Sequence, residues 1–368
     1  MSGANRSLVQ MMIELRDNHG IDPFVVYPKI PRDSTRTIRD ALQEHGIPGV
    51  SHRLTCFMRK NVGGLYKIYY IFASVIYFIH LRFLLRNQSF DLVHSNSSVI
   101  DMGLFIARSL HIPHIWHFRE VASLSFGAKP ILGERYQRYI YGKSDRIIAI
   151  SKNVKQEFGD LIPDDRTVVI QNGIVPPKVS RFPNHDAELV NICIVGRVEP
   201  NKNQLEAVKA IKALNCESLS KVKLHIIGDC AGEYAKEVKQ YVSANGLEDH
   251  VILYGVRNDV DTMLQDMNIG LMLSHHEAFG RVTVEYMMHR VCVIASNTSA
   301  NPEIVHDGRN GLLYNIGDSK ELSLKIDLLI KNRDLIKRLS EDGFSDAMMN
   351  YLSETNSTSV YNLYNALI

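Results

Sequence analysis

The sequence has few cysteines and no regular cysteine pattern. Several of them stand in apolar, strand-like runs, where packing in a core is the expected role. Structural zinc is usually held by closely paired ligands, so the scattered pattern argues against a zinc site and is typical of a reducing cytosol. The five cysteines, an odd number without any Cys-x-x-Cys spacing, are Cys56, Cys193, Cys216, Cys230 and Cys292.

Net charge and several common signatures are also missing. The chain has 42 Lys and Arg against 40 Asp and Glu, a formal net charge of +2, so its global field does not indicate a nucleic-acid partner. No Gly-x-Gly-x-x-Gly follows a strand-like run, which argues against a Rossmann dehydrogenase. We expect no signal peptide, because the first residues are small and polar and run directly into a helix pattern.

Acidic residues are absent from residues 45–90. Within this segment, residues 68–85 are apolar or aromatic nearly all round, and the uninterrupted run 68–79 is shorter than the roughly 20 residues that span a bilayer. Two interpretations stay open. One is a buried helix of a first domain with basic ends in solvent, and the other adds a peripheral contact with an anionic membrane surface. The basic residues of the segment are Arg53, Arg59, Lys60, Lys67, Arg82 and Arg86.

The length of 368 residues exceeds one ordinary hydrophobic core and predicts two domains. Apolar strand-like runs alternate with helical patterns, which indicates an α/β fold with parallel sheets. Pro176, Pro177 and the polar residues 178–188 mark a linker. We therefore expect an N-terminal domain over residues 1–180 and a C-terminal domain over residues 181–354, with a last helix at about 355–368 that packs back on the first domain.

The start of the chain departs from the usual order of an α/β domain. Such a domain begins with an apolar strand that leads into a glycine turn and a helix. Here the turn, residues 2–5, and the helix, residues 6–18, have no strand before them. We expect that the first strand of the N-terminal domain is missing from this chain.

A charged turn, residues 196–202, follows the first strand of the second domain and reads Gly-Arg-Val-Glu-Pro-Asn-Lys. A glycine turn with Arg197 and Lys202 near a helix start suits a diphosphate, because fixed cations lie beside free backbone amides. Open parallel sheets bind ligands at the carboxyl ends of their strands, where this turn stands. The alternative is that both cations are ordinary surface residues.

Two acids flank a second strand-to-helix turn. Glu277 stands at the carboxyl end of the strand 271–273, residues 278–280 open the following helix, and Glu285 lies about two turns into it. The amides at a helix start attract anions. The alternative is that the helix dipole favours such acids with no ligand involved. Together the two turns predict a nucleotide-diphosphate site, with cations for phosphate and carboxylates for hydroxyls.

These segments resemble motifs of the retaining glycosyltransferases of family 4, the glycosyl transferases group 1. The family's Glu-x7-Glu is represented by Glu277 and Glu285, and its Gly-Arg-x4-Lys by residues 196–202. The resemblance covers nearly the whole chain, and it implies the GT-B architecture of two Rossmann-like parallel-sheet domains with an interdomain cleft. Further matching segments are 302–305 and 307–313 in the second domain and 3–7, 112–120 and 169–174 in the first.

The resemblance implies roles for particular residues. Arg197 and Lys202 would neutralise the donor's diphosphate, Glu277 would bind hydroxyls of the sugar, and Glu285 would bind the ribose. His117, from the first domain, would face the donor sugar. The implied donor-binding set is Gly196, Arg197, Lys202, Arg257 beside the base, Glu277, Ala278, Phe279 and Gly280 through their amides, Arg281 and Glu285; the catalytic set is His117, Glu277, Arg197 and Lys202; the acceptor-side loop is Gly3, Ala4 and Asn5.

The resemblance also implies an activity. The chain would be a metal-independent transferase of the hexosyltransferase type that moves a sugar from a nucleotide-diphosphate sugar to a saccharide or lipid-linked saccharide acceptor in surface polysaccharide biosynthesis. No cofactor is expected besides this co-substrate, because two basic side chains neutralise the diphosphate. Residues 259–261, Asp-Val-Asp, are predicted to cap a helix rather than to bind a metal.

We expect a cytoplasmic enzyme that is peripheral on the inner face of the cell membrane, which it would contact through residues 45–90. Two alternatives to transfer stay open: a sugar-nucleotide-binding protein without transfer activity, and a GT-B-type nucleotide-sugar epimerase. Two segments depart from the family's pattern. Residues 289–292, His-Arg-Val-Cys, replace a Gly-x-Pro-Val turn, and residues 298–301, Thr-Ser-Ala-Asn, stand where members often carry paired glycines.

Overall fold

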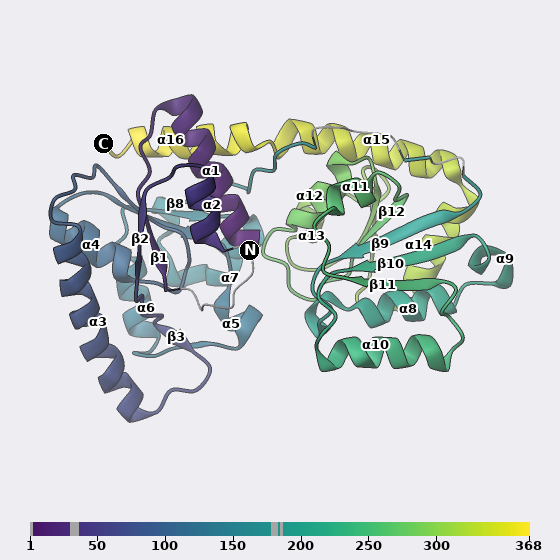
Figure 1. Ribbon diagram of the computed structural model, residues 1–368, viewed down its shortest axis with the longest axis horizontal. Coiled ribbons are helices and arrows are strands. Elements are labelled where there is room, and N and C mark those ends of the chain that lie inside the picture. The colour runs from purple at the N-terminus through teal and green to yellow at the C-terminus, as the bar shows by residue number, and fades with distance from the viewer. Residues whose placement is uncertain (1–2, 30–36, 178–182, 185–186) are drawn as a thin grey trace. The chain divides into compact units, whose positions relative to one another are not determined.

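The computed structural model describes residues 3–29, 37–177, 183–184 and 187–368. The chain divides into two compact units (Figure 1). Unit 1 comprises Met1–Gly173 and Ser353–Ile368, and unit 2 comprises Ile174–Leu352. Residues 178–182 and 185–186 of the predicted linker, and with them the predicted domain boundary, lie outside the described residues.

Unit 1 contains a parallel four-stranded sheet in the order β4-β5-β7-β8, a parallel pair β1-β2 and an antiparallel pair β3-β6. Its strands are β1 (Val25–Pro28), β2 (Gly49–His52), β3 (Met58–Arg59), β4 (Val93–Ser95), β5 (His114–Phe118), β6 (Lys129–Pro130), β7 (Arg146–Ala149) and β8 (Thr167–Val169). Its helices are α1 (Gly3–His19), α2 (Ile38–Glu44), α3 (Gly64–Leu84), α4 (Met102–Leu110), α5 (Ala122–Phe126), α6 (Glu134–Tyr141), α7 (Lys152–Phe158) and α16 (Ser353–Asn365).

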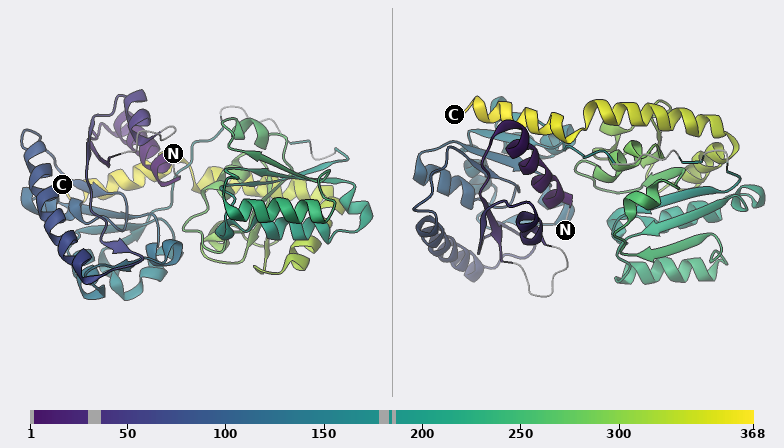
Figure 2. Two further views of the ribbon diagram at one scale, coloured as in Figure 1. Left: turned by 60° about the horizontal axis from the view of Figure 1, so that its bottom comes forward. Right: turned by 45° about the horizontal axis from the view of Figure 1, so that its top comes forward.

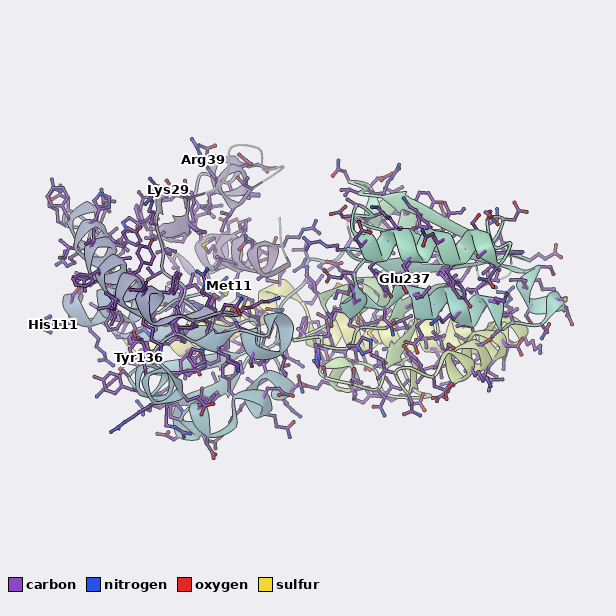
Figure 3. All side chains as sticks on the ribbon, turned by 90° about the horizontal axis from the view of Figure 1, so that it is seen from below. Met11, Lys29, Arg39, His111, Tyr136 and Glu237 are labelled. Atoms are coloured by element: carbon purple, nitrogen blue, oxygen red, sulfur yellow. The ribbon has the colours of Figure 1, made fainter. Side chains whose placement is uncertain are left out.

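The core of unit 1 forms around β5, all five residues of which are buried. A strand buried on both faces is typical of a covered parallel sheet. Trp116, at its centre, packs edge-on against Tyr141, with the ring centroids 4.9 Å apart. On one side of the sheet, α1 and α16 pack together through Met11 and Val360 (Figure 2). In Figure 3, Met11 points into the unit, whereas His111 lies at its surface.

The predicted glycine turn at the start of the chain is wrong for its described residues. Helix α1 begins at Gly3, so Gly3, Ala4 and Asn5 form the first turn of a helix rather than a loop. The amides of a first helical turn have no partner within the helix, so glycine and asparagine cost little there. The acceptor-side role of these residues stays a prediction.

The interpretation of residues 68–85 as a buried core helix is wrong for most of that helix. Helix α3 buries only Tyr70, Ala73 and Leu81, and most of its large apolar side chains are exposed. Among the described residues, α3 is the one helix that is long and apolar enough to cross a membrane, by length and composition.

Unit 2 contains a six-stranded parallel sheet in the order β11-β10-β9-β12-β13-β14. Its strands are β9 (Val190–Val195), β10 (Val222–Ile227), β11 (Val251–Gly255), β12 (Ile269–Met272), β13 (Cys292–Ser296) and β14 (Leu312–Tyr314). Its helices are α8 (Gln204–Lys212), α9 (Cys216–Leu219), α10 (Glu233–Ala244), α11 (Val260–Leu264), α12 (Arg281–Met288), α13 (Asn301–Ile304), α14 (Ser319–Lys331) and α15 (Arg333–Asn350).

The strand order of unit 2 reverses direction between β9 and β12. The chain builds outward from β9 to β10 and β11 on one side, and from β12 to β14 on the other. In open α/β sheets, such a switch point leaves a crevice at the carboxyl ends of the two central strands, where ligands bind. The charged turn after β9 and the Glu277 loop after β12 therefore emerge side by side.

Helix α12 is held close to the sheet at this point. A Cβ atom added to Gly270 on β12 would lie 2.4 Å from Cδ2 of Tyr286, so only glycine lets the tyrosine ring pack there. The hydroxyl of Tyr286 accepts a hydrogen bond from the backbone amide of Val195, at 2.8 Å. One side chain thus ties α12 to both central strands and fixes the helix that carries Glu285.

Several histidines of unit 1 are buried without charge. His114 lies between two hydroxyls, with Nε2 2.8 Å from Oγ of Ser95 and Nδ1 2.9 Å from Oγ of Ser144. Burial lowers its pKa to about 3, and burial also lowers the pKa of His117 well below its usual range. An unfolded histidine titrates near 6.5, so between these pKa values the unfolded chain binds more protons than the folded one.

We expect acid to destabilise unit 1. Its free energy of unfolding should fall as the pH drops below about 6.5, by up to about 1.4 kcal/mol per pH unit for each buried neutral histidine. The measurement is urea unfolding at several pH values, followed by the fluorescence of Trp116, which is the chain's single tryptophan and belongs to unit 1. His114→Gln should reduce the number of protons taken up on unfolding by about one, and so lower the slope of the free energy of unfolding against pH. An unchanged slope would contradict the assignment of His114 as a buried neutral histidine.

Candidate active site

The turn after β9 depends on close contact between two glycines. Gly196 and Gly228 have φ values of 151° and 153°, a backbone conformation that favours glycine. A Cβ atom on Gly228 would lie 1.9 Å from the carbonyl oxygen of Gly196. The amide of Gly196 donates to the carbonyl of Ile227 at 2.9 Å. The turns after β9 and β10 therefore lie backbone against backbone, and this contact fixes where the charged turn starts.

Asn201 joins the turn after β9 to the loop after β12. Its carbonyl accepts from the amide of His275 at 2.9 Å, and its side-chain oxygen accepts from the amide of His276 at 3.0 Å. Its side-chain amide donates to the carbonyl of His276 at 3.1 Å. The sequence reasoning assigned no role to Asn201, and its place inside the Gly-Arg-x4-Lys segment was the only signal.

The predicted cation and acid meet across this junction. Nζ of Lys202 lies 2.6 Å from Oε2 of Glu277, and the two side chains are 24% and 18% exposed. Oγ of Ser274 also donates to Oε2 of Glu277, at 3.3 Å. The stem of Lys202 packs over Gly196, and a Cβ atom added to Gly196 would lie 3.8 Å from it. A half-buried pair feels stronger attraction than one in bulk water, because less solvent screens it.

The second predicted acid has a cation of its own. Nε of Arg281 lies 2.9 Å from Oε1 of Glu285, and both side chains are about one-fifth exposed (22% and 20%). Helix α12 begins at Arg281, so Glu285 lies just over one turn into it and not the predicted two turns. The reason is Gly280, whose left-handed φ of 96° is incompatible with a helix interior and keeps residues 278–280 in the loop.

Phe279 anchors the loop that precedes α12. Its side chain is 3% exposed and packs against Tyr351 with the ring centroids 5.8 Å apart. Next to it, a Cβ atom on Gly280 would come within 3.2 Å of Oγ1 of Thr283 and 3.3 Å of Ile304. Because one side chain is buried and the other is absent, the loop can offer a ligand only backbone groups at these two positions.

A third loop, after β13, donates hydrogen bonds to the loop that carries Glu277. The amide of Ala300 donates to the carbonyl of Glu277 at 3.2 Å, and Oγ1 of Thr298 donates to the carbonyl of Ser274 at 3.2 Å. Ser299 has a left-handed φ of 51°, and Arg290 at the end of α12 has 56°. Residues 289–292 and 298–301, the two segments that depart from the family's pattern, therefore each include a residue in a conformation that glycine adopts more easily.

The remaining predicted cations of unit 2 lie in solvent. The side chain of Arg197 is 71% exposed and 3.9 Å from Glu199. Arg257 forms an ion pair with Asp259 at 2.6 Å. Asp259 occupies the N-cap position of α11 but makes no capping hydrogen bond, so the predicted cap is wrong, because Arg257 takes its carboxylate. Within the described residues, no group of three or more His, Cys, Asp or Glu is arranged to hold a metal.

His117 belongs to a hydrogen-bonded network inside unit 1. Its Nδ1 lies 3.1 Å from Nε2 of His94 and 3.4 Å from Nη2 of Arg119. Nδ1 of His94 lies 2.6 Å from the hydroxyl of Tyr364 on α16. Sequence reasoning missed His94 and Tyr364, because 270 residues separate them and no local pattern joins them.

The network fixes the tautomer of His117. An arginine side chain can only donate hydrogen bonds, so Nδ1 of His117 accepts and the single proton of the neutral ring lies on Nε2. Burial and the nearby Arg119 cation lower the pKa of His117, which keeps the ring neutral. His94 then donates to His117 and accepts from Tyr364. Nε2 of His117 is buried and has no partner among the described residues, so the neutral ring carries one unpaired buried donor.

Two family models together match almost the whole chain. The model described as Glycosyltransferase Family 4 matches residues 1–176, and the model described as Glycosyl transferases group 1 matches residues 178–346. A glycosyltransferase of Methanocaldococcus jannaschii, itself uncharacterised, is 29% identical over 264 residues, which are 71% of each chain. The capsular polysaccharide biosynthesis glycosyltransferase CapM of Staphylococcus aureus is 25% identical over 236 residues, 60% of this chain and 62% of CapM.

Solved glycosyltransferase structures share the fold. HepE of Anabaena, solved in complex with UDP and glucose, gives a TM-score of 0.78 at 21% identity over 100% of this chain and 96% of HepE. Sucrose-phosphate synthase of Thermosynechococcus elongatus gives 0.76 at 17% identity over 100% and 94%. At these identities the likeness concerns the fold, and it confirms the predicted α/β class with GT-B architecture.

We expect Gly228→Ala to disrupt the site through the backbone alone. The new Cβ would overlap the carbonyl of Gly196 and adopt a strained φ, so unit 2 should lose about 2 kcal/mol or more of stability. Circular dichroism during thermal unfolding reports the whole chain, and Trp116 fluorescence reports unit 1 separately. Gly232→Ser is the matched control, because Gly232 caps α10 with open space around it. Equal stability of the two variants would refute the contact.

Proposed function

Because the chain belongs to the glycosyl transferases group 1, with a family 4 model matching its first half, we propose that this glycosyltransferase moves a sugar from a nucleotide-diphosphate sugar to a saccharide or lipid-linked saccharide acceptor with retention of configuration. One observation carries the proposal. The half-buried pair of Lys202 and Glu277 joins the loops of the two central strands, at the switch point of the sheet.

The donor's diphosphate binds to Arg197 and Lys202 in this proposal. When the glycosidic phosphate bond breaks, negative charge develops on the leaving diphosphate and positive charge on the sugar. Cations fixed beside the phosphate then stabilise the transition state more than the ground state. Lys202 exchanges its partner from Glu277 to phosphate, and the carboxylate becomes free to accept hydrogen bonds from sugar hydroxyls. The amides of Phe279 and Gly280 approach the same part of the donor.

The nucleoside end of the donor lies at α12 in this proposal. Glu285 accepts hydrogen bonds from the ribose hydroxyls, and the ion pair with Arg281 holds its carboxylate in place. The exposed Arg257 borders the base. The solved complex of HepE with UDP and glucose supports a uridine diphosphate sugar as the donor class.

We assign the sugar contact of unit 1 to His117, whose Nε2–H donates to a hydroxyl of the donor sugar. Retention would follow from attack on the same face that the leaving group occupies. The acceptor oxygen bonds to the anomeric carbon as the bond from that carbon to the phosphate oxygen breaks, and the acceptor's proton passes to the leaving phosphate oxygen. This route needs no covalent intermediate and no second carboxylate.

The acceptor in this proposal belongs to a surface polysaccharide. The similarity to CapM, a capsular polysaccharide biosynthesis glycosyltransferase, supports that assignment. Such an enzyme would act in the cytoplasm, peripheral on the inner face of the cell membrane, with no metal ion or further cofactor.

We expect Lys202→Ala and Glu285→Ala each to lower kcat/KM for the donor at least tenfold, about 1.4 kcal/mol. Lys202→Ala should act mainly on kcat, because it removes a charge that stabilises the leaving group. Glu285→Ala should act mainly on the donor KM, because the ribose is bound equally in the ground state and in the transition state. The measurement is initial-rate kinetics with a panel of nucleotide-sugar donors, in which product formation and donor hydrolysis are followed separately.

The control variants make the same chemical change in the same unit. Lys320→Ala on α14 and Glu237→Ala on α10 remove exposed charges outside the proposed site (Glu237 is labelled in Figure 3). Both should keep the wild-type rate. If Lys202→Ala and Glu285→Ala also turn over at the wild-type rate, the site assignment fails.

A further inference from the structure

Helix α3 has two opposite apolar faces, of which the fold covers only one. The covered face repeats at Tyr70, Ala73, Tyr77 and Leu81, where it packs against the rest of unit 1. The outward face repeats with the same helical spacing through large apolar side chains. Six of these, each more than half exposed, are Leu65, Ile68, Phe72, Ile76, Ile79 and Phe83. We call this set the outer stripe of α3.

The covered face is fixed to unit 1 by polar bonds as well as packing. The hydroxyl of Tyr70 donates to the buried carboxylate of Asp101 at 2.6 Å. The hydroxyl of Ser74 donates to Thr55 at 3.0 Å. An α-helix of this length is about 31 Å long and could span a bilayer only after leaving these partners, which would place the hydroxyls of Tyr70 and Ser74 in hydrocarbon without them. The helix is therefore built to lie along a surface while it stays attached to unit 1.

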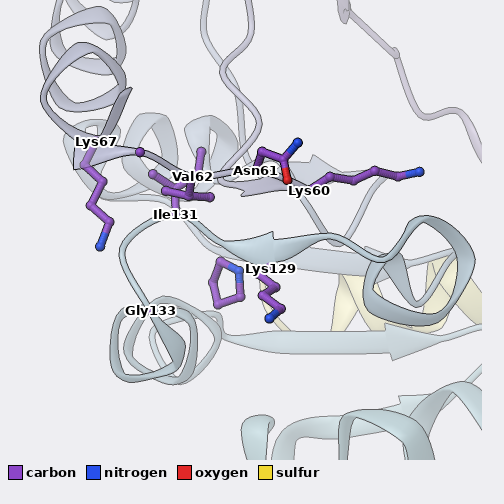
Figure 4. A pocket seen from close by; sticks show the side chains of 9 residues that line it. Lys60, Asn61, Val62, Lys67, Lys129, Ile131 and Gly133 are labelled. Atoms are coloured by element: carbon purple, nitrogen blue, oxygen red, sulfur yellow. The ribbon is translucent and has the colours of Figure 1, made fainter. Parts of the chain in front are cut away.

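A basic pocket opens beside the first turn of α3. Its volume is about 570 Å³, and Lys60, Lys67 and Lys129 line it together with neutral residues (Figure 4). Strand β3 pairs with β6 in the register Arg59 to Lys129, which brings the distant Lys129 to this place. None of the three ammonium groups forms an ion pair with any residue that the structure describes. Three lysines thus surround the pocket, and none of the residues that line it is acidic.

These features together select an anionic bilayer as the partner of α3. Residues 45–90 contain no acid, so the face beside the outer stripe repels cationic surfaces and attracts anionic ones. Tyr66 and Tyr69 stand near the basic end of the helix, where aromatic rings with a polar tip suit the headgroup layer. The guanidinium of Arg59 lies 4.0 Å from the centre of the Tyr66 ring, so the basic segment and the helix start form one surface.

We infer that α3 lies flat in the surface of an anionic bilayer, with its outer stripe among the acyl chains and the pocket of Lys60, Lys67 and Lys129 on a lipid headgroup phosphate. The inference rests on the proposed function in that it names the membrane at which the acceptor would be met. It needs no assumption about the donor site. Figures 1 and 2 show α3 along the outside of unit 1, and the side chains of the outer stripe are exposed.

The test is vesicle flotation of the full chain with three lipid compositions: phosphatidylcholine alone, phosphatidylcholine with phosphatidylglycerol, and phosphatidylcholine with oleate at equal negative charge. Phosphatidylglycerol vesicles should bind the wild type at least tenfold more tightly than neutral vesicles, and more tightly than oleate vesicles. Equal binding to oleate vesicles would overturn the phosphate pocket. No binding to any vesicle would overturn the whole inference.

Two variants separate the two parts of the surface. Lys60→Gln, Lys67→Gln and Lys129→Gln combined should weaken binding to phosphatidylglycerol vesicles at least tenfold and leave the weak binding to neutral vesicles unchanged. Phe72→Ser with Ile76→Ser should weaken binding to all vesicles at least tenfold, because the acyl-chain contact is lost. Wild-type binding by either variant would overturn the corresponding part.

Matched controls lie in unit 2. Leu324→Ser with Leu328→Ser removes two exposed apolar side chains at the same helical spacing on α14, and it should bind vesicles like the wild type. Lys212→Gln, Lys236→Gln and Lys320→Gln combined make the same charge change at exposed positions. Donor hydrolysis without vesicles should be unchanged in every variant of this set. Loss of vesicle binding with normal donor hydrolysis thus tests the membrane surface, whereas the Lys202 variant tests the proposed function.

Discussion

The ion pair of Lys202 with Glu277 is the contact around which the candidate site of unit 2 is arranged. It joins the loops of β9 and β12 at the one place where the strand order reverses. The bonds of Asn201 set the distance between those loops, and the backbone contact of Gly196 with Gly228 fixes the start of the turn after β9 against the turn after β10. Much of the binding geometry is therefore built into the backbone, so a ligand would find charges already positioned and would lose little freedom in arranging them.

Glu277 and Glu285, the two acids of the Glu-x7-Glu motif, each form an ion pair with a cation, and this pairing has a chemical consequence. A carboxylate beside a diphosphate would repel it if no cation lay between them. Lys202 and Arg281 prevent that repulsion for Glu277 and Glu285. Among the described residues, the exposed Arg197 has one distant ion-pair contact, with Glu199, so it adds a positive charge that Glu277 and Glu285 do not cancel. If Lys202 changes its partner from Glu277 to a phosphate, the change costs less than desolvating a free ammonium group, because the lysine is already partly dehydrated.

The sequence allowed the positions of the candidate donor-site residues of unit 2 to be predicted, because they cluster in short segments at strand ends, whereas their role in donor binding stays a prediction. Glu277, Glu285 and Lys202 each follow an apolar run closely enough for the pattern to place them. The tie made by Asn201 and the tautomer of His117 could not be predicted. The first depends on a carbonyl and a side chain meeting a loop 75 residues away. The second depends on Arg119 approaching Nδ1 of His117 inside a buried network whose other members, His94 and Tyr364, are far apart in the sequence. The start of α12 was predicted at residues 278–280 and lies at Arg281, because the positive φ of Gly280 has no signature beyond the glycine itself.

Helix α3 illustrates a limit of composition as a guide to burial. An apolar sequence around the whole helix is equally consistent with a core helix and with one that faces lipid, because both environments exclude water. The distinction comes from the neighbours. Tyr70 and Asp101 hold one face in unit 1, while nothing described in that unit covers Phe72. Exposing an apolar stripe of this length to water costs free energy. The acid-free segment beside it favours an anionic bilayer as the place where the stripe is buried, because such a bilayer has apolar acyl chains beneath an anionic headgroup layer.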